Sequence, residues 1–288
     1  MHTKKYSTFA AYKNLPMEKK VVLITGASSG IGLEVARQLM NKGCCVYACS
    51  RRGGMAEKSE AGIGEIRPLK VDVNNDASIE NAIQLVLAEM GKLDAVICNA
   101  GNGIAGAVED CSEEEVRFQM ETNFFGAVRT IQKCLPVFRE QGYGKIMLTS
   151  SVAAIVPIPY QAFYSAGKAA ASIFMQALSM EVKPYGIQCC TVLPGDTKTD
   201  FTASRKYANK SQTDDSVYAE RMKKSIAKME HDEKNGMEAA FVARKMVTQI
   251  LQKKMKPIII PGFQYKLICG IFIIIPVKLR LWIVSKLY

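Results

Sequence analysis

Residues 21–32 read Val-Val-Leu-Ile-Thr-Gly-Ala-Ser-Ser-Gly-Ile-Gly, and this stretch decides the fold that the chain is expected to adopt. The four apolar residues that open it are typical of a strand that is covered on both faces, as in a parallel sheet. The glycines predict a tight turn into a helix over about residues 31–41, which Gly43 ends. A strand, a glycine-rich turn and a helix in this order indicate the start of a β-α-β unit.

The same alternation of strands and helices continues to about residue 260. Ser112 and Glu115 have the spacing of a capping box at the start of the longest helix. Alternating elements of this kind require right-handed crossovers and a parallel sheet. We therefore predict an α/β fold with a single doubly wound parallel sheet (Rossmann fold), helices on both faces and a C-terminal hydrophobic appendage. Further strands are predicted at about 44–49, 66–71, 93–98, 145–149, 187–192 and 257–260, and helices at about 76–90, 112–138, 161–183 and 238–252.

The chain of 288 residues suits one large α/β domain better than two small ones. We expect a disordered N-terminal extension at residues 1–16, a Rossmann domain at 17–262 and an amphipathic, hydrophobic tail at 263–288. Residues 197–236 are charged and lack a strong core pattern, so we interpret them as a lid over the substrate. An ordinary surface insertion is the alternative.

Positive charge is concentrated at the ends of the chain. The formal net charge is +11: residues 1–20 contribute +4, residues 241–288 contribute +9, and residues 21–240 contribute −2. A nucleic-acid-binding protein carries such charge on its folded body, so no nucleic acid is expected as a partner. The nine cysteines form no C-x-x-C pair and suit reduced thiols in the cytoplasm rather than disulfides or a metal site. Residues 1–20 also lack the apolar segment of a signal peptide.

The glycine-rich turn is the first candidate binding site. Gly26 allows a tight turn, Gly30 allows a pyrophosphate to approach the backbone, and Gly32 allows the helix to pack closely on the strand. The N–H groups at the start of the helix would bind the phosphates. The segment Gly-Ala-Ser-Ser-Gly also matches the nucleophile elbow of hydrolases, but only His2 and His231 are available as a base. A dinucleotide site is therefore favoured over a serine hydrolase.

The end of the second predicted strand indicates which cofactor is used. NAD enzymes place an acid there for the adenosine ribose, whereas this chain has Ser50 followed by Arg51 and Arg52. No carboxylate would repel a 2′-phosphate, and two guanidinium groups would bind one. Solvent-facing turn residues are the alternative interpretation of the arginines. We expect NADP(H) to be preferred over NAD(H).

Tyr164 and Lys168 lie four residues apart near the start of a predicted helix and so share one face. An ammonium about 4 Å from a phenol, at an effective dielectric of about 20, would lower the pKa of the phenol by up to about three units. Such a phenol suits acid–base chemistry. This pair alone is common on amphipathic helices. Ser151, however, follows the preceding strand at the sheet edge where ligands bind, and Asn123 is a poor helix former within a long helix.

Together these motifs resemble the short-chain dehydrogenase/reductase family over about residues 19–262. The resemblance implies that Tyr164 donates a proton to a carbonyl oxygen while nicotinamide delivers a hydride. Ser151 would hold that oxygen, Lys168 would bind the nicotinamide ribose and lower the pKa of Tyr164, and Asn123 would support Lys168 through a water. The matching motifs are T-G-x-x-x-G-I-G at 25–32, Asp72 after the third strand, N-A-G at 99–101, Asn123, Ser151, Y-x-x-x-K at 164–168 and P-G-x-x-x-T at 194–199.

The resemblance also implies the roles of individual binding residues. Asp72 would bind the edge of the adenine, Asn99 the adjoining backbone and ribose, and Thr199 the phosphate or carboxamide region. The complete set of Asn123, Ser151, Tyr164 and Lys168 indicates an enzyme rather than a protein that only binds NADP(H). The implied cofactor-binding residues are Gly26, Ser28, Ser29, Gly30, Ile31, Gly32, Ser50, Arg51, Arg52, Asp72, Val73, Asn99, Ala100, Gly101, Tyr164, Lys168, Pro194, Gly195, Thr197 and Thr199.

Apolar residues near the catalytic motif predict a hydrophobic ketone, aldehyde or alcohol as substrate. The candidate walls are Ile104, Ile158, Tyr160 and Phe163, with Ser151 at the reacting carbon. Within the family this segment most resembles hydroxysteroid and retinol dehydrogenases, and keto-sphingoid or fatty-acyl ketones are the alternative substrates. The resemblance further implies a homodimer or homotetramer that is formed through the helices at 112–138 and 161–183.

The C-terminal tail contains an apolar nonapeptide from Leu267 to Ile275. As a helix it would span only about 14 Å of a hydrocarbon core about 30 Å thick, so a transmembrane helix is not expected. Lys278 and Arg280 alternate with apolar residues in the segment that follows. Two interpretations remain open: residues 267–288 lie on an anionic membrane surface, or they fold back over the substrate mouth or a partner subunit. The first would make a cytoplasmic protein peripheral on a membrane.

Overall fold

The computed structural model describes residues 19–213 and 215–288, so the predicted extension at 1–16 lies outside the described residues. The strands are β1 (Val21–Thr25), β2 (Cys45–Ser50), β3 (Glu57–Lys58), β4 (Glu65–Lys70), β5 (Ala95–Cys98), β6 (Ile104–Ala105), β7 (Gly144–Thr149), β8 (Ile187–Val192), β9 (Thr197–Lys198), β10 (Lys206–Tyr207), β11 (Met237–Glu238) and β12 (Ile258–Ile259). The α-helices are α1 (Gly30–Asn41), α2 (Asp76–Met90), α3 (Glu113–Met120), α4 (Gly126–Gln141), α5 (Ala162–Glu181), α6 (Phe201–Ser204), α7 (Ala219–Lys234), α8 (Ala239–Leu251), α9 (Phe263–Ile274) and α10 (Val277–Leu287).

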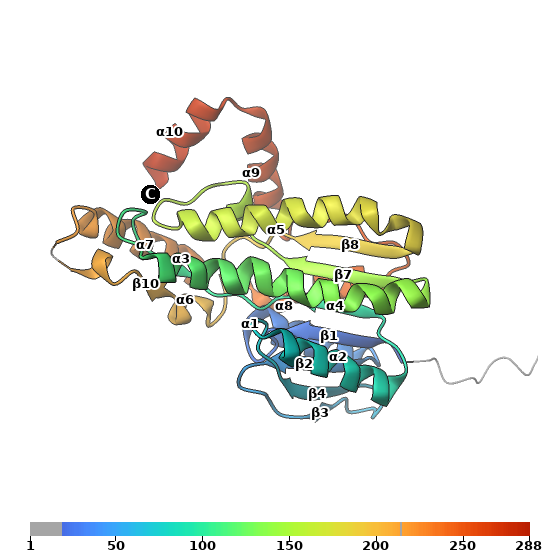
Figure 1. Cartoon of the computed structure of the whole chain (residues 1–288). Coiled ribbons are helices and arrows are strands. Elements are labelled where there is room, and N and C mark those ends of the chain that lie inside the picture. Colours follow the sequence, from blue (N-terminus) through green and yellow to red (C-terminus); the bar gives the residue numbers. More distant parts are fainter. Residues whose placement is uncertain (1–18, 214) are drawn as a thin grey trace, which may run out of the picture.

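An eight-stranded sheet in the order β12-β8-β7-β5-β1-β2-β4-β3 forms the centre of the molecule (Figure 1). Its strands pair in parallel, apart from the antiparallel pair of β3 and β4. From β1 the chain winds outward through β2 and β4, then returns to β5 on the other side of β1. This reversal opens a crevice at the carboxyl ends of β1 and β5, where ligands bind in such sheets. The predicted doubly wound Rossmann sheet is confirmed.

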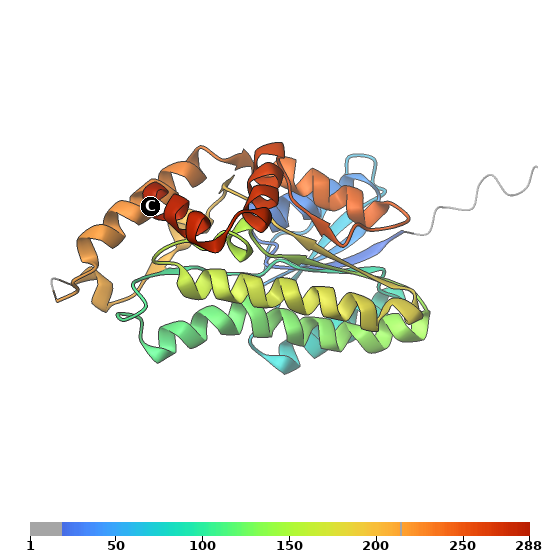
Figure 2. The same cartoon turned by 90° about the horizontal axis from the view of Figure 1, so that it is seen from above.

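Helices cover both faces of the sheet, as Figure 2 shows from above. On one face Val86 of α2, Phe138 of α4 and Met175 of α5 belong to a single buried core. On the other face Leu39 of α1 and Met246 of α8 belong to a second core. Because β1 lies between the two cores, all five of its residues are buried, which explains its unbroken apolar sequence.

The helix predicted at 112–138 is not continuous. A π-helical turn at Glu121–Phe125 separates α3 from α4. The turn contains the buried Asn123, whose Nδ2 donates to the carbonyl oxygen of Asn102 at 2.9 Å and whose Oδ1 accepts from the Asn102 N–H at 2.8 Å. Single π turns within α-helices occur frequently at functional sites. The capping box of Ser112 and Glu115 is present as predicted.

Residues 197–236 contain a core pattern that the sequence analysis missed. Met222, Ile226 and Met229 form one buried stripe on α7 and pack with Ala105 in a small separate cluster. The stripe escaped notice because charged residues dominate α7, and the partner in the cluster lies more than a hundred positions earlier in the sequence. These residues therefore fold as a packed segment beside the sheet.

The tail forms two short helices that meet at Pro276 (Figure 1). The helix α9 rises from the main body, and α10 runs back so that Tyr288 packs against the α7 cluster. Of the two interpretations left open by the sequence, folding back over the body is therefore seen directly. Among the described helices, none combines the length and the apolar character needed to cross a bilayer.

Candidate active site

A cavity of about 1130 Å³ lies at the carboxyl ends of the central strands and extends beneath the tail. Its walls come from the β1–α1 turn, the ends of β2, β5 and β7, the start of α5, the segment after β8, and the helices α9 and α10. All of the predicted cofactor-binding residues line this cavity except Gly32. Residues from widely separated motifs therefore meet at one site.

The glycine-rich turn has the shape that a pyrophosphate requires. Gly26 adopts a φ of +67°, and a Cβ there would lie 2.7 Å from the Cα of Ala100. A Cβ on Gly32 would lie 2.4 Å from the carbonyl oxygen of Gly26, which explains why Gly32 packs behind the turn instead of lining the cavity. The side chain of Ser29 makes no capping hydrogen bond at the start of α1. The backbone N–H groups of that first turn therefore remain available, and they fit a bound diphosphate.

The two arginines lie at the end of the cavity where the sequence analysis predicts the adenosine. Arg51 and Arg52 are exposed at its rim, and Arg52 Nη2 donates to Ser28 Oγ at 3.0 Å. Ser50 Oγ donates to the carbonyl oxygen of Gly53, so the hydroxyl stabilises the turn that presents both arginines. Asp72 lines the cavity after β4, and its Oδ1 accepts from the N–H of Asn74. The arrangement brings positive charge, rather than a carboxylate, next to the glycine-rich turn.

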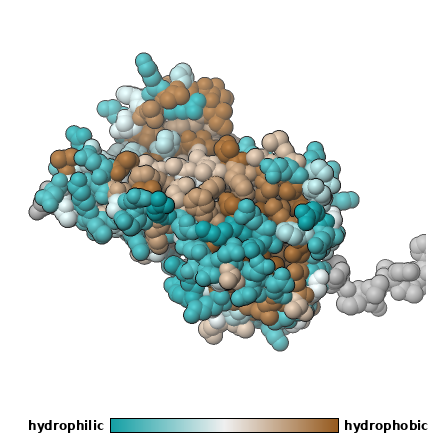
Figure 3. Space-filling model, in the orientation of Figure 1, coloured by the Kyte–Doolittle hydropathy of each residue, from teal (hydrophilic) through white to brown (hydrophobic). Residues whose placement is uncertain are grey.

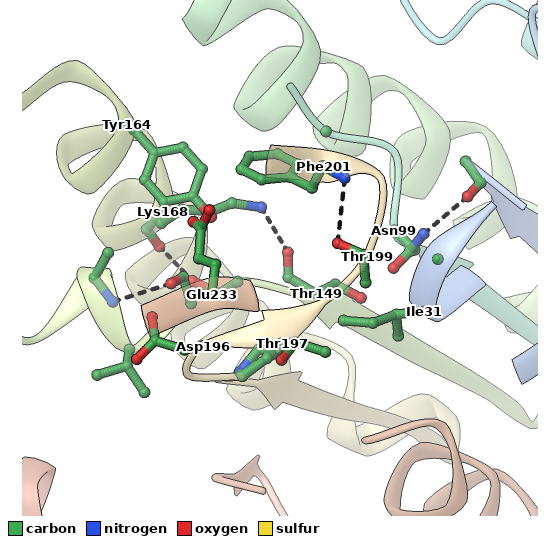
Figure 4. Close-up of a pocket in the computed structure, with 18 of the residues that line it drawn as sticks. Ile31, Asn99, Thr149, Tyr164, Lys168, Asp196, Thr197, Thr199, Phe201 and Glu233 are labelled. Carbon is green, nitrogen blue, oxygen red and sulfur yellow. Dashed lines mark hydrogen bonds between the residues drawn. The ribbon is translucent and has the colours of Figure 1, made fainter. Parts of the chain in front are cut away.

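Asn99 and Thr199 lie next to the glycine-rich turn. Asn99 Nδ2 donates to the carbonyl oxygen of Gly26 at 3.0 Å, so it ties the end of β5 to the turn after β1. Thr199 comes from the segment after β8, yet a Cβ on Gly30 would lie 3.2 Å from the Cβ of Thr199. Figure 4 shows Asn99, Thr199 and Ile31 on the same side of the cavity. Both residues therefore lie where a dinucleotide would run along the turn.

Tyr164, Lys168 and Ser151 line the middle of the cavity, and Figure 4 labels the tyrosine and the lysine. Lys168 Nζ donates a hydrogen bond of 2.9 Å to the carbonyl oxygen of Thr149 and lies 5.7 Å from the centroid of the Tyr164 ring. Ser151 Oγ accepts from the N–H of Ala153 at 3.1 Å, which fixes the serine at the end of β7. The three side chains therefore converge as the sequence motifs suggested.

The electrostatics of the pair differ from the expectation. Burial raises the pKa of Tyr164 to about 12, although hydrogen bonding with Ser151 lowers it. Burial also lowers the pKa of Lys168 to about 8. The expected lowering of the tyrosine pKa by Lys168 is therefore wrong, because desolvation of the phenol dominates and the ammonium of Lys168 bonds to the carbonyl oxygen of Thr149. The phenol stays protonated at neutral pH, as a proton donor must.

Asn123 does not line the cavity. Its side chain holds the backbone of Asn102, and a Cβ on Gly101 would lie 3.2 Å from Asn123 Oδ1 and 3.6 Å from Lys168 Nζ. The asparagine and the lysine are therefore neighbours across Gly101. The water-mediated support of Lys168 stays a prediction.

The predicted substrate walls are only partly brought together. Ser151 and Ile158 line the cavity, whereas Ile104, Tyr160 and Phe163 do not. Ile104 is buried in β6, which pairs with β10, and Tyr160 packs against the α7 cluster. Phe163 immediately precedes Tyr164 on α5 and so points about 100° away from it around the helix axis. Closeness in sequence to Tyr164 and Lys168 was therefore a poor guide to the residues that line the cavity.

The apolar walls at this end come from the C-terminal tail, which one of the two interpretations of residues 267–288 placed over the substrate mouth. Ile268 and Phe272 of α9, and Ile283, Val284 and Leu287 of α10, supply apolar surface. Their only signal in the sequence was the concentration of apolar residues in the tail.

Acidic side chains also reach this end of the cavity. Glu233 lines it and pairs with the fully buried Arg205 at 2.6 Å, while Asp196 accepts a hydrogen bond from the hydroxyl of Tyr265. Figure 4 shows the carboxylate of Glu233 on the same side of the cavity as Tyr164. The charges of Glu233 and Asp196 also raise the pKa of Tyr164, and that of Arg205 lowers it. Polar groups therefore surround the reactive phenol while the tail provides the apolar surface.

Neither a hydrolytic triad nor a metal cluster is formed by the described residues. Ser28 Oγ accepts from Arg52, whereas His231 is exposed on α7 and contacts Asn235. Over residues 19–213 and 215–288, no group of three or more His, Cys, Asp or Glu side chains is arranged to hold a metal ion. The geometry thus supports the dinucleotide site rather than the nucleophile elbow.

Known proteins resemble the chain in sequence and in structure. Residues 20–210 match the family described as short chain dehydrogenase. A 3-ketodihydrosphingosine reductase of Bacteroides thetaiotaomicron is 42% identical over 221 residues, which cover 76% of this chain and 79% of that protein. An NADPH-dependent 1-acyldihydroxyacetone phosphate reductase of Saccharomyces cerevisiae is 33% identical over 65% of this chain and 64% of its own length. A crystal structure of a short-chain dehydrogenase from Streptomyces avermitilis superposes with a TM-score of 0.76 at 26% identity, covering 89% of this chain and 93% of its own.

Proposed function

The chain belongs to the short-chain dehydrogenase family of oxidoreductases, and from this premise we propose that it reduces the ketone of a long-chain lipid with NADPH. One observation carries the proposal: the cavity that holds Tyr164, Ser151 and Lys168 continues into an apolar compartment built by α9 and α10. A polar reaction centre with an apolar extension suits a substrate whose carbonyl is attached to a hydrocarbon chain. A keto-sphingoid base is the favoured substrate, in agreement with the 42% identical relative.

The residues of the chain divide the chemistry among them. The phenol of Tyr164, which is protonated at neutral pH, donates its proton to the carbonyl oxygen. The hydroxyl of Ser151 binds the same oxygen and orients the carbonyl. Lys168 would hold the nicotinamide ribose, and its ammonium, 5.7 Å from the centroid of the Tyr164 ring, would keep a positive charge beside the phenol as the proton leaves. When bound, the nicotinamide would supply the hydride for the carbonyl carbon.

The preference for NADP(H) rests on the end of β2. Arg51 and Arg52 line the cavity beside the phosphate-binding turn, and Ser50 replaces the acid that would repel a 2′-phosphate. The yeast relative described as NADPH-dependent is consistent with this preference. Arg52 Nη2 lies 3.0 Å from Ser28 Oγ, at the side of the cavity where the adenosine ribose would be bound.

We further propose that the enzyme works as a homodimer or homotetramer in the cytoplasm. Ile173 and Met180 of α5 are exposed apolar residues on the helices through which the assembly is expected to form. All nine cysteines are free, as they would be in a reducing compartment. Sedimentation of the wild type and of an Ile173→Glu/Met180→Glu variant would show whether this face joins the subunits.

The substrate proposal is tested by measuring NADPH consumption with 3-ketodihydrosphingosine, a 17-ketosteroid, retinal and 1-acyldihydroxyacetone phosphate. We expect the keto-sphingoid base to have the highest kcat/KM. A higher value for the steroid or for retinal would overturn the substrate assignment, and equal rates with NADH would overturn the cofactor preference. If none of the ketones is reduced although NADPH binds, the proposed reduction of a lipid ketone is overturned.

A further inference from the structure

The helix α9 is apolar on two opposite sides. Tyr265, Cys269 and Phe272 form the inner side, which is buried against the body. The outer side carries Phe263 and Ile274, whose residues are 82% and 83% exposed, together with Leu267 and Ile271 between them. A helix that is apolar all round is normally buried in a core or in a membrane. The inner side of α9 is covered by this protein, but the outer side is not covered by any described residue.

The second tail helix continues this outer surface. Ile283 and Val284 of α10 line the cavity, whereas Val277, Leu281 and Trp282 are exposed. Eleven of the 22 exposed large apolar residues in the described chain lie between Phe263 and Leu287. Figure 3 shows the corresponding brown surface on the projecting tail. We call this exposed surface of α9 and α10 the outer tail face. Apolar surface concentrated in this way marks a site of interaction.

The charged side chains that α9 and α10 themselves carry are all positive. Lys266, Lys278 and Lys286 are exposed on the two helices, and residues 263–288 contain no acidic residue. Arg280 has a structural task, because its guanidinium donates to the carbonyl oxygens of Ile275 and Ile273 at the end of α9. Arg280 therefore fixes the corner between the helices, and the three lysines remain to interact with a partner. That partner should combine an apolar interior with a negatively charged surface.

We propose that the outer tail face docks on an anionic lipid surface, and that the cavity beneath it receives its substrate from that bilayer. The docking itself is independent of catalysis, whereas the delivery of a lipid ketone rests on the proposed function. Apolar residues, lysines and one tryptophan on a pair of short helices are typical of segments that lie in the membrane interface. Because the same two helices line the cavity with their inner sides, docking places the cavity wall directly against the lipid.

A second copy of the chain fits this face less well than lipid does. A symmetric dimer would bring the three lysines of each tail together with those of the other, and neither tail contributes an acid to compensate them. In contrast, each lysine near an anionic membrane surface raises the affinity of the protein for that surface about fivefold. The positive charge of the tail therefore favours an anionic lipid surface over a second copy of the chain.

Trp282 provides a direct probe, because it is the only tryptophan of the chain and is 59% exposed on the outer tail face. Its fluorescence should shift to the blue and become protected from acrylamide when the full-length protein meets phosphatidylglycerol vesicles. Phosphatidylcholine vesicles should have a much smaller effect. No shift with either vesicle, or an equal shift with both, would overturn the proposal. A shift that develops with protein concentration in the absence of lipid would assign the face to a second copy of the chain instead.

Two variants separate the apolar and charged contributions. Leu267→Gln/Ile274→Gln leaves Trp282 and the cavity lining unchanged and should abolish the shift. Lys266→Gln/Lys278→Gln/Lys286→Gln should weaken binding to the anionic vesicles about 100-fold. Met55→Gln/Val217→Gln removes two similarly exposed apolar residues elsewhere on the surface and serves as the matched control. Thermal unfolding of all variants checks that each is folded, and binding by the Leu267/Ile274 variant at the wild-type level would contradict the assignment.

The delivery of substrate is tested by activity. The Leu267→Gln/Ile274→Gln variant should keep the wild-type kcat/KM for a short, water-soluble ketone and lose activity towards a long-chain ketone embedded in anionic vesicles. An equal loss on both substrates would show that the tail acts only through the shape of the cavity and would overturn delivery from the bilayer. If the wild type reduces neither ketone although it binds vesicles, the proposed function fails while the docking surface stands.

Discussion

Lys168 places its ammonium over the ring of Tyr164, 5.7 Å from the ring centroid. The ammonium is buried and bonds to a backbone carbonyl at 2.9 Å instead of to a carboxylate. Burial consequently lowers the pKa of Lys168 to about 8, so the charge that the site uses is held at a cost to folding stability.

Lys168→Met should therefore stabilise the cofactor-free protein at pH 7 by about 2 kcal/mol, after the lost hydrogen bond is subtracted. Between pH 8 and about pH 10.5 the unfolded wild type binds a proton that the folded state has released, so its unfolding free energy rises with pH. The difference in unfolding free energy between Lys168→Met and the wild type should therefore become smaller from pH 8 to about pH 10.5. Urea unfolding at pH 7 and at pH 10 measures this difference. A stability difference that is the same at both pH values would contradict the lowered pKa of Lys168. Lys70→Met, at an exposed position, controls for the loss of a charge.

Tyr164→Phe should lower kcat by about 100- to 10,000-fold, because the carbonyl oxygen loses its proton donor. The dissociation constant of NADPH, measured by titration of its fluorescence, should stay within about twofold, since the phenol binds no phosphate. Tyr160→Phe is the matched control, because Tyr160 is four residues away but does not line the cavity. Comparable losses of kcat in both variants would remove Tyr164 from the reaction.

Arg51→Ala/Arg52→Ala should raise the dissociation constant of NADPH by about 10- to 100-fold, which corresponds to the loss of charge-assisted hydrogen bonds to a phosphate. The affinity for NADH should change little, because NADH lacks the 2′-phosphate. Calorimetric titration with both nucleotides measures the two effects. Arg139→Ala, on the exposed end of α4, should leave both unchanged. A parallel loss of NADH affinity would mean that the arginines only shape the turn.

Tyr265→Phe should loosen the tail. The hydroxyl of Tyr265 donates to Asp196 Oδ2 at 2.9 Å and accepts from the Asp196 N–H at 3.0 Å, so it joins α9 to the segment after β8. Removing it should cost about 1–2 kcal/mol of local stability and speed proteolytic cleavage of the tail. Tyr185→Phe, on an exposed tyrosine, is the control. Unchanged cleavage kinetics would show that apolar packing alone holds α9.

Local patterns were sufficient for the sheet and for the glycine-rich turn into α1. The helix predicted at 76–90 and the strand predicted at 187–192 have these bounds in the structure. The long helix at 112–138 was predicted without its π turn, since that turn depends on the hydrogen bonds between Asn123 and Asn102. An amide in a helix signals a local conflict, but only the folded chain shows which backbone groups resolve it.

The sequence by itself determined the fold class and the catalytic motif, because strand burial, glycine turns and the four-residue spacing of Tyr164 and Lys168 are local properties of the chain. Only the tertiary structure decided which residues line the apolar end of the cavity and what surrounds Tyr164 and Lys168. Phe272 and Leu287 reach the cavity from the far end of the chain, while Ile104 and Phe163 turn away from it. Packing between distant segments and the burial that results from it have no local signature, so they become visible only when the chain is folded.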